Sequence, residues 1–448
     1  MDDLDADYDG PEIALLSRPS SSHHNPEPSR SDESSKMTRQ GNLRAYWLGA
    51  VLCIGGFLFG YDSGIIGGVL TLQSFERDYG YTKTSATRFT SLANSLQQLG
   101  AFLSCFLVWP VTRRFGRKWS LVASSIIFCI GALVQTINTG SFATFCVFRF
   151  ISGLGLGSSS VVIPMFSSEM TPKTIRGQIG SFYQLFYTFG IFTSYWIDYG
   201  VKADIAATKS SQWQIPVGIQ LVPGALLGLG VLTLPESTRW LTSKGRHEEA
   251  WKSLTWIRAD SGPDTQLEME EIRQGVEIEQ HAREGLATKE LVTNKSHFKL
   301  MVTAAAVFTA QQATGATAFA YYGPQYFALL VGNAGNRDLL LTAIFGAIKV
   351  AACLCFVLFV ADRVNRKAIL IAGATFMGAT MISTAAVVKT HPAPTSADPH
   401  VTHSGIATVA LIYMFVIAYN FSWGPLPCKS SFSRQCRHAD PRFRAYRV

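Results

Sequence analysis

Two charged side chains stand inside long apolar runs of this 448-residue sequence. Asp62 lies in "GGFLFGYDSGIIGG", and Arg149 opens "RFISGLGLGSS". A charge at the centre of a bilayer costs at least about 2.5–3.5 kcal/mol on insertion scales, so two opposite charges are expected to face one another. Protonation of Asp62 would then free Arg149 to move. The pair predicts a proton-coupling switch, with a static structural ion pair as the alternative.

Neutral amides form a second group of polar side chains in apolar runs. Gln184 lies in "SFYQLFYTFG", and Gln311 and Gln312 begin "QQATGATAFAYYG", in which Tyr321 and Tyr322 follow. An amide donates and accepts hydrogen bonds, as the hydroxyls of a polyol do. Aromatic faces pack against the C–H surface of a sugar ring. The pattern fits a polyol site, and it fits hydrogen bonding between helices equally well.

Two further features allow more than one interpretation. The glycines of "GLGLG", from Gly153 to Gly157, are spaced like a dinucleotide-binding loop. They follow no strand and lie in an apolar run, so close packing between helices is the better interpretation. Lys349 lies deep in a later apolar run. It could reach the membrane surface, pair with a carboxylate or line a cavity, and the sequence does not choose among these.

The elements that must position these residues are membrane-spanning helices. The chain is 48% hydrophobic and only 16% charged, and a helix needs about 20 apolar residues to cross roughly 30 Å of hydrocarbon. The composition and its patterning therefore predict an all-α membrane protein. Ten apolar runs are expected to span the bilayer, at about 46–70, 90–110, 119–137, 142–165, 179–200, 214–234, 300–330, 338–360, 368–388 and 404–427.

The loops give the orientation. "RRFGRKWS", "PKTIRGQ" and "DRVNRK" are dense in Arg and Lys, which places them, the N-terminus and the long central loop in the cytoplasm. The net charge of +8 sits in such loops and forms no basic face, so nucleic acid is not an expected partner. Residues 1–44 are polar and predict a disordered tail.

Enzyme chemistry has little support. No nucleophile stands near a base at matching spacing, and no phosphate-binding loop lies in a soluble segment. Most of the eight cysteines lie in apolar runs, so they are interpreted as small buried side chains, not as disulfides or metal ligands. We expect no enzyme activity, no cofactor and no metal site.

Eight motifs follow one another along the chain: "GYDSGIIGG", "RFGRK", "RFISGLGLG", "SSEMTPKTIRGQIGSFYQ", "LPESTRWLTSKGR", "QQATGATAFAYY", "ADRVNRK" and "SWGPLP". In this order they resemble the sugar porter family of the major facilitator superfamily, including fungal monosaccharide and hexose transporters, from residue 46 to 427. The resemblance implies two pseudo-symmetric helical bundles with a sugar site between them and alternating access. Ten of the expected twelve transmembrane helices are present.

The resemblance also implies a division of the chain and roles for single residues. The expected parts are a cytoplasmic tail at 1–44, a six-helix bundle at 45–234, a cytoplasmic loop with short helices at 235–298, an incomplete four-helix bundle at 299–427 and a divergent basic tail at 428–448. Asp62 and Arg149 match the proton-coupling pair. The substrate-binding positions are Gln184, Gln311, Gln312, Thr317, Tyr322 and Asn420. The cytoplasmic gate network comprises Arg114, Arg117, Glu169, Arg176, Glu236, Arg239, Asp362, Arg363 and Arg366.

Several positions depart from the family pattern. Thr317 stands where the family usually has a sugar-binding Asn, which leaves the choice of cargo open. Arg113 replaces an Asp, and Asn365 replaces a Gly in the second copy of that loop motif. Cys428 takes the position of a Trp, and the basic segment after it is too short for two more spans. We expect a frameshift, an unspliced intron or a truncated gene model, with a real shortened isoform as the alternative, and an inactive or poorly active product where the two spans are missing.

The expected function is transport of a monosaccharide or related polyol, by proton symport, across the plasma membrane. Its partners are the sugar or polyol, the proton and the lipid bilayer. A facilitative uniporter, a quinate or other polyol transporter, and a nutrient sensor without transport are the alternatives.

Overall fold

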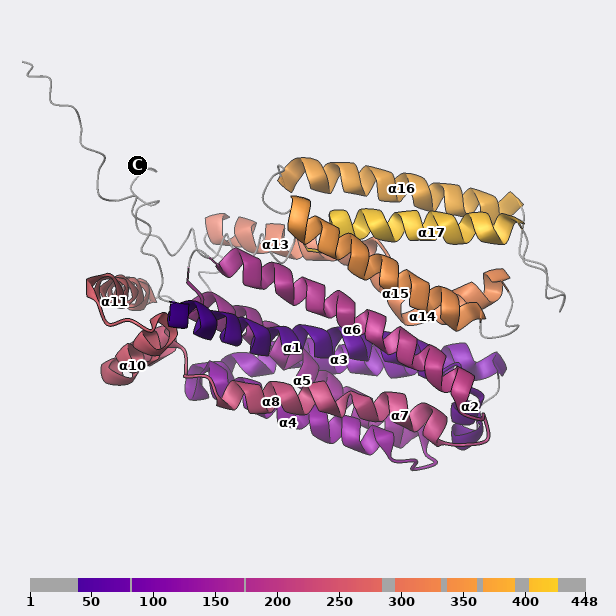
Figure 1. The fold of residues 1–448 in the computed structure, drawn as a ribbon, viewed down its shortest axis with the longest axis horizontal. Helices are drawn as coiled ribbons and strands as arrows, with labels where there is room; N and C mark the ends of the chain where they lie inside the picture. The colour runs from indigo at the N-terminus through magenta and orange to yellow at the C-terminus, as the bar shows by residue number, and fades with distance from the viewer. Residues whose placement is uncertain are drawn as a thin grey trace, which may run out of the picture. The chain divides into compact units, whose positions relative to one another are not determined.

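The computed structural model describes residues 39–80, 83–172, 175–283, 295–331, 337–360, 366–390 and 403–425. All regular structure in these ranges is helical, which confirms the predicted all-α class (Figure 1). The first part of the chain forms α1 (Arg39–Val69), α2 (Gln73–Tyr79), α3 (Lys83–Phe115), α4 (Arg117–Thr136), α5 (Phe142–Met170), α6 (Arg176–Asp204), α7 (Ser211–Ile219) and α8 (Leu221–Leu232). The rest forms α9 (Thr238–Ser243), α10 (His247–Arg258), α11 (Pro263–Arg283), α13 (Lys295–Ala313), α14 (Ala316–Val331), α15 (Arg337–Cys355) with the π-helical turn η3 (Phe356–Val360), α16 (Arg366–Thr390) and α17 (His403–Phe421).

Eight helical stretches in the described part of the chain are long and apolar enough to cross a membrane, and each coincides with one of the ten predicted runs. They are Arg39–Val69, Arg88–Phe115, Arg117–Thr136, Phe142–Met170, Ser211–Leu232, Arg337–Phe359, Lys367–Thr390 and His403–Phe421. The predicted run 179–200 is also helical, within the 29 residues of α6. Gln184, Asp198 and Lys202 make α6 less apolar than its neighbours.

The predicted run 300–330 is helical, but it forms two helices. It divides into α13 and α14 at Thr314 and Gly315. Gly315 has a φ of +78°, in the left-handed region that glycine adopts without steric cost. Gln311 and Gln312 lie in the last turn before this break. In some membrane transporters, discontinuous helices of this kind supply binding groups.

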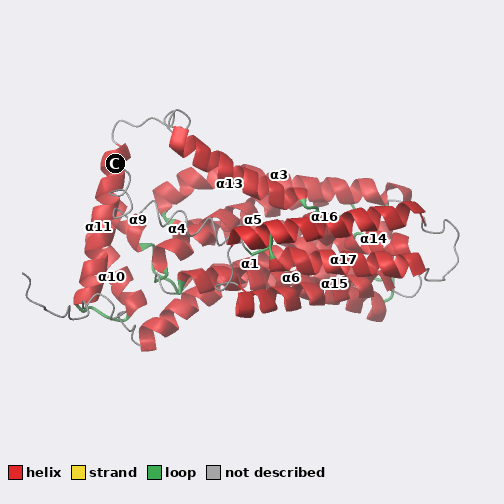
Figure 2. Cartoon of the chain, turned by 90° about the horizontal axis from the view of Figure 1, so that it is seen from above, coloured by secondary structure: helices red, strands yellow, loops and turns green. Residues whose placement is uncertain are grey.

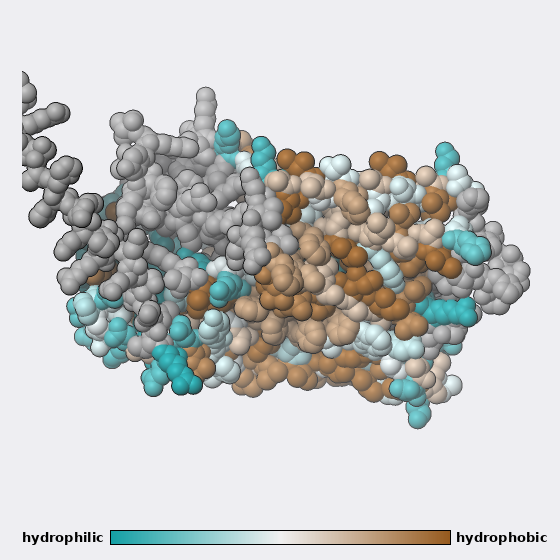
Figure 3. Space-filling model, turned by 45° about the horizontal axis from the view of Figure 1, so that its top comes forward, coloured by the Kyte–Doolittle hydropathy of each residue, from teal (hydrophilic) through white to brown (hydrophobic). Residues whose placement is uncertain are grey.

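An apolar surface covers the middle of the helical unit on the face drawn in Figure 3. Figure 3 shows hydrophobic side chains across its centre and hydrophilic ones toward the ends. On α3, Leu99, Phe102, Phe106 and Trp109 follow one another at helical spacing with their side chains outward, and Phe106 is 65% exposed. Such a continuous apolar face is what contact with lipid chains requires.

Glycines allow the helices of the first bundle to pack at backbone distance. A Cβ on Gly153 would lie 2.3 Å from the carbonyl oxygen of Gln97 in α3, and one on Gly157 would lie 2.3 Å from that of Ala101. A Cβ on Gly155 would lie 2.5 Å from the carbonyl oxygen of Ser124 in α4. The "GLGLG" segment therefore packs α5 against α3 on one side and α4 on the other, which confirms its interpretation as a packing motif.

The two parts of the chain meet along α6 and α15 and along α1 and α14. Figure 1 shows α15 lying beside α6. Tyr195 of α6 donates a hydrogen bond of 2.8 Å to the carbonyl of Ala320 in α14. A Cβ on Gly67 of α1 would lie 2.6 Å from the carbonyl oxygen of Tyr321. We call the contact of α6 with α15 the seam.

Short polar helices lie at one end of the unit. Figure 2 shows α9, α10 and α11 gathered there. Arg44 at the start of α1 donates a hydrogen bond of 2.7 Å to the carbonyl of Trp256 in α10. The six cysteines in the described residues are free, and Cys53, Cys146 and Cys353 are buried. Cys428 and the tail after it lie outside the described residues.

Candidate functional site

The predicted pair of Asp62 and Arg149 forms a buried ion pair. The Arg149 Nη1 atom lies 2.9 Å from Asp62 Oδ1, and both side chains are 0% exposed. Asp62 comes from α1 and Arg149 from α5. Removing one member of such a buried pair leaves an uncompensated charge, at a cost of about 3–5 kcal/mol.

Two glutamines that the sequence interpretation missed complete this cluster. Gln97 of α3 donates from Nε2 to Asp62, and its Oε1 accepts a hydrogen bond from Arg149. Gln135 of α4 accepts from Arg149 Nη1 at 3.4 Å. The Nε atom of Arg149 is buried with no hydrogen-bond partner. Four helices therefore hold the pair, and the Nε–H donor of the arginine is left unused.

The cluster is connected to the second part of the chain through Tyr321 of α14. Its hydroxyl accepts a hydrogen bond of 2.5 Å from Gln98, the neighbour of Gln97, and lies 3.5 Å from the hydroxyl of Ser63, the neighbour of Asp62. A shift of α1 or α3 at the ion pair thus moves a contact with α14. The sequence interpretation had treated Tyr321 as a sugar-contacting aromatic.

The structure brings some of the predicted substrate residues together. Gln312 Oε1 accepts a hydrogen bond of 2.7 Å from the hydroxyl of Thr317, across the break between α13 and α14. Gln311 Nε2 donates to the carbonyl of Trp423 at 2.8 Å, just beyond α17. Gln184 is buried on α6, one turn before Thr188. These contacts engage Gln311 Nε2 and Gln312 Oε1 within the protein, so a cargo hydroxyl would have to replace them.

Tyr322 and Asn420 lie on different helices. The hydroxyl of Tyr322 lies 3.3 Å from that of Ser91 in α3. Asn420 is fully buried on α17, where its Nδ2 donates to the carbonyl of Val416 at 2.9 Å. Its Oδ1 atom is buried with no hydrogen-bond partner. An orphaned buried acceptor of this kind is available to a ligand hydroxyl.

The gate residues of the first part of the chain bond among themselves. Arg117 Nη2 lies 2.7 Å from Glu169 Oε1. The carboxylate of Glu236 accepts from the backbone N–H of Arg117 at 2.8 Å and of Lys118 at 3.1 Å. Glu236 therefore caps the N-terminus of α4, where the helix dipole favours a negative charge. A Cβ on Gly116 would lie 2.3 Å from Glu236 Oε2, which explains the glycine there.

The other gate residues have separate surroundings. Arg176 donates to the carbonyl of Thr171 at 3.1 Å. Arg239 pairs with Glu279 of α11 at 2.9 Å, and the exposed Arg114 lies over the ring of Phe115. Asp362 and Arg363 lie outside the described residues, and so does the side chain of Arg366. The role of this set as a gate stays a prediction.

The seam carries charges of its own. Lys202 of α6 lies 3.1 Å from Asp338 of α15, whose side chain is 2% exposed. Asp198 is fully buried on α6, and neither of its carboxylate oxygens has a hydrogen-bond partner. Lys349 of α15 is buried above the ring of Tyr187. The sequence interpretation missed Asp198 and Asp338, because each lies near the end of an apolar run, where a charge is usually solvated.

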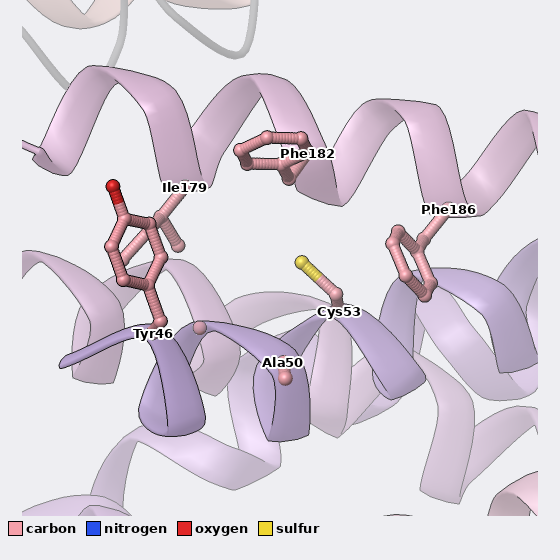
Figure 4. Close-up of a pocket in the computed structure, with 7 residues that line it drawn as sticks. Tyr46, Ala50, Cys53, Ile179, Phe182 and Phe186 are labelled. Carbon is pink, nitrogen blue, oxygen red and sulfur yellow. The ribbon is translucent and has the colours of Figure 1, made fainter. Parts of the chain in front are cut away.

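The pocket in Figure 4 is not the predicted cargo site. It has a volume of about 170 Å³ and is lined by Tyr46, Gly49, Ala50, Cys53, Ile179, Phe182 and Phe186 of α1 and α6. None of these is a predicted substrate residue, and the lining offers little hydrogen-bonding capacity for a polyol.

A polar cluster lies at the end of the first bundle that is opposite to Gly116 and Glu236. Asp78 of α2 accepts hydrogen bonds from the indole N–H of Trp213 at 2.8 Å and the amide of Asn138 at 3.1 Å. Burial raises the pKa of Asp78, but hydrogen bonds from Ser210, Trp213 and Arg77 outweigh this and hold the pKa below its ordinary value. The carboxylate is therefore ionised near neutral pH and fixes α2 against α7.

A helical membrane unit with a buried acid–arginine pair beside the contact of two bundles is a secondary transporter. Residues 48–439 match the model of the sugar (and other) transporter family, so the chain belongs to that family. It transports a sugar or a related polyol across a membrane and is not an enzyme.

The curated relatives include fungal permeases. The chain is 33% identical over 397 residues to a probable quinate permease of Neosartorya fischeri, covering 86% of this chain and 73% of the relative. It is 32% identical over 399 residues to the quinate permease of Neurospora terricola, covering 86% and 74%.

The fold of the chain is similar to that of solved transporter structures. The proton:xylose symporter XylE bound to 6-bromo-6-deoxy-D-glucose matches with a TM-score of 0.73 and 25% identity, over 87% of this chain and 82% of that one. A partially occluded inward open form of XylE from E. coli matches with a TM-score of 0.70 and 24% identity, over 86% and 84%. These matches support the predicted major facilitator fold.

Proposed function

We propose that the chain is a proton symporter for a cyclic polyol or monosaccharide. The observation that carries the proposal is the ion pair of Asp62 and Arg149, fully buried and hydrogen-bonded to Gln97. Binding a proton would neutralise Asp62 and weaken its attraction to Arg149. The neighbouring contacts of Ser63 and Gln98 with Tyr321 would then change, and α14 belongs to the other part of the chain. Protonation and rearrangement of the two bundles are thereby linked.

The cargo is proposed from two lines of support. The relatives named as quinate permeases favour a polyol ring, and the XylE neighbours favour a pentose or hexose. Gln311, Gln312 and Thr317 lie at the broken helix, where backbone and side chains can exchange their partners for ligand hydroxyls. A facilitative uniporter is the competing mechanism.

Proteoliposomes with an inward proton gradient test the mechanism. The transporter should accumulate labelled cargo, and a protonophore should abolish the accumulation. Asp62→Asn should still exchange cargo across the membrane but should not accumulate it, because the neutral amide mimics the protonated acid. Asp204→Asn, which changes an exposed carboxylate at the end of α6, should behave like the unmodified protein. Uptake that only equilibrates the cargo across the membrane, and that the protonophore does not change, would leave the uniporter as the better account.

The orientation and the membrane are also proposals. The basic loops support a cytoplasmic N-terminus in the plasma membrane. Cysteines introduced near Lys118, Arg176 and Arg366 should react only with reagents that enter the cytoplasm. Labelling of these positions from outside intact cells would show that the proposed orientation is wrong.

A further inference from the structure

Lys349 is a buried cation in the seam. Its side chain belongs to α15 and is 4% exposed. The ammonium lies 5.8 Å from the centre of the Tyr187 ring of α6 and 5.9 Å from that of Phe345. It therefore points at the helix of the other bundle, not at the membrane surface. Reaching the surface, one interpretation left open by the sequence, does not describe this position.

The carboxylates of the seam do not neutralise this charge. Asp338 already pairs with Lys202. Asp198 packs against α1, where a Cβ on Gly68 would lie 2.1 Å from its Oδ2 atom. Among the described residues, the ion pairs within 4 Å do not include Lys349. Aromatic faces attract an ammonium, but they offset only part of the cost of removing it from water.

Gln184, a predicted substrate residue, lies on the helix that the ammonium faces. Gln184 precedes Tyr187 by three residues on α6, so the two side chains are neighbours on one face of the helix. Gly346, one turn before Lys349, comes close to α6, where its Cβ would lie 3.0 Å from the ring of Tyr195. Tyr187 contacts the ammonium and has Gln184 as its neighbour on α6, so the ammonium and the amide both border Tyr187. A ligand held there would need an anionic group and a hydroxyl.

We propose that Lys349 binds the carboxylate of an anionic cargo, and that the cargo is a polyol acid, of which quinate is an example. The inference rests on the proposed function and makes its substrate class specific. A carboxylate that accepts hydrogen bonds from the ammonium supplies the counter-charge that the described residues do not provide. The ring hydroxyls then have Gln184 as a partner.

The test compares quinate with quinamide, its neutral carboxamide, which has the same ring and hydroxyls. Binding of each is measured to the full chain in lipid nanodiscs, with D-xylose as a third ligand. The protein should bind quinate at least about tenfold more tightly than quinamide. Lys349→Met should bind the two equally, and Lys349→Arg should restore the preference for quinate.

The matched control is the double variant Lys202→Met/Asp338→Asn. It removes an ion pair from the same seam without leaving an unpaired charge, and it should keep the preference for quinate. If Lys349→Met does not fold, Lys349→Gln, which also lacks the charge but keeps a polar side chain, takes its place in the comparison.

Each outcome has one meaning. Equal binding of quinate and quinamide by the unmodified protein, or a preference that survives Lys349→Met, overturns the role of Lys349. Binding of D-xylose without binding of quinate also overturns it, while leaving sugar transport intact. Binding of none of the three ligands would count against the proposed function itself.

Discussion

The ion pair at the centre of the first bundle makes an asymmetric prediction about stability. Arg149→Met leaves Asp62 with a donor from Gln97 but no counter-charge, so it should cost about 3–5 kcal/mol. Asp62→Asn also leaves a buried charge without its partner, but Arg149 keeps acceptors on Gln97 and Gln135, so its cost should lie at the lower end of that range, about 3 kcal/mol. The double variant, which combines Asp62→Asn with Arg149→Met, contains no unpaired charge. Its cost should fall below the sum of the single costs by at least about 1 kcal/mol.

Thermal unfolding of the purified protein in nanodiscs measures this cycle. The midpoint temperature should fall most for Arg149→Met, less for Asp62→Asn, and the double variant should regain part of the loss. Asp204→Asn supplies the control for a carboxylate exposed to solvent. Additive changes, or two single variants as stable as the unmodified protein, would refute the view that the pair is a desolvated, mutually dependent unit.

Three further predictions concern other parts of the molecule. Gly116→Ala should destabilise the folded protein by about 1–3 kcal/mol, because φ is +93° and the new Cβ would meet Glu236. Gly140 also has a positive φ, +65°, but its Cβ would meet open space, so Gly140→Ala should cost less in the same unfolding assay. The pKa of Asp78 is lowered in the folded state, so its stabilisation should be complete above the unfolded pKa of about 4 and be lost as the pH falls through the lower folded pKa. Asp78→Asn should remove that part of the acid sensitivity, and an unchanged acid profile would contradict the assignment. Gln311→Ala should weaken sugar binding by about 1–3 kcal/mol, and an unchanged affinity for every sugar bound would exclude Gln311 from the site.

The spans and the ion pair were predictable because both follow from the cost of polar groups in hydrocarbon. Burying either Asp62 or Arg149 alone in hydrocarbon would cost several kcal/mol, so a pair of the two was the expected arrangement. The structure contains this ion pair. Gln97 could not be recognised in the same way. A single amide in an apolar run is commonly bonded to a neighbouring helix, so its position beside the pair depends on how α3 packs against α1 and α5.

Contacts between distant segments were the part that the sequence did not reveal. The break at Gly315 depends on one residue's backbone conformation, which an average over an apolar run conceals. The capping of α4 by Glu236 joins residues 119 positions apart. Lys349 could be placed in a span but not assigned a partner, because its environment is set by α6.

Coupling between cargo and proton is the central claim, and calorimetry of cargo binding tests it most directly. Quinate and D-xylose are titrated into the protein at one pH in buffers with different ionisation enthalpies. If binding of cargo is linked to protonation of Asp62, the observed enthalpy should change with the buffer, and Asp62→Asn should remove that dependence. A binding enthalpy that is the same in every buffer and at every pH would contradict proton symport.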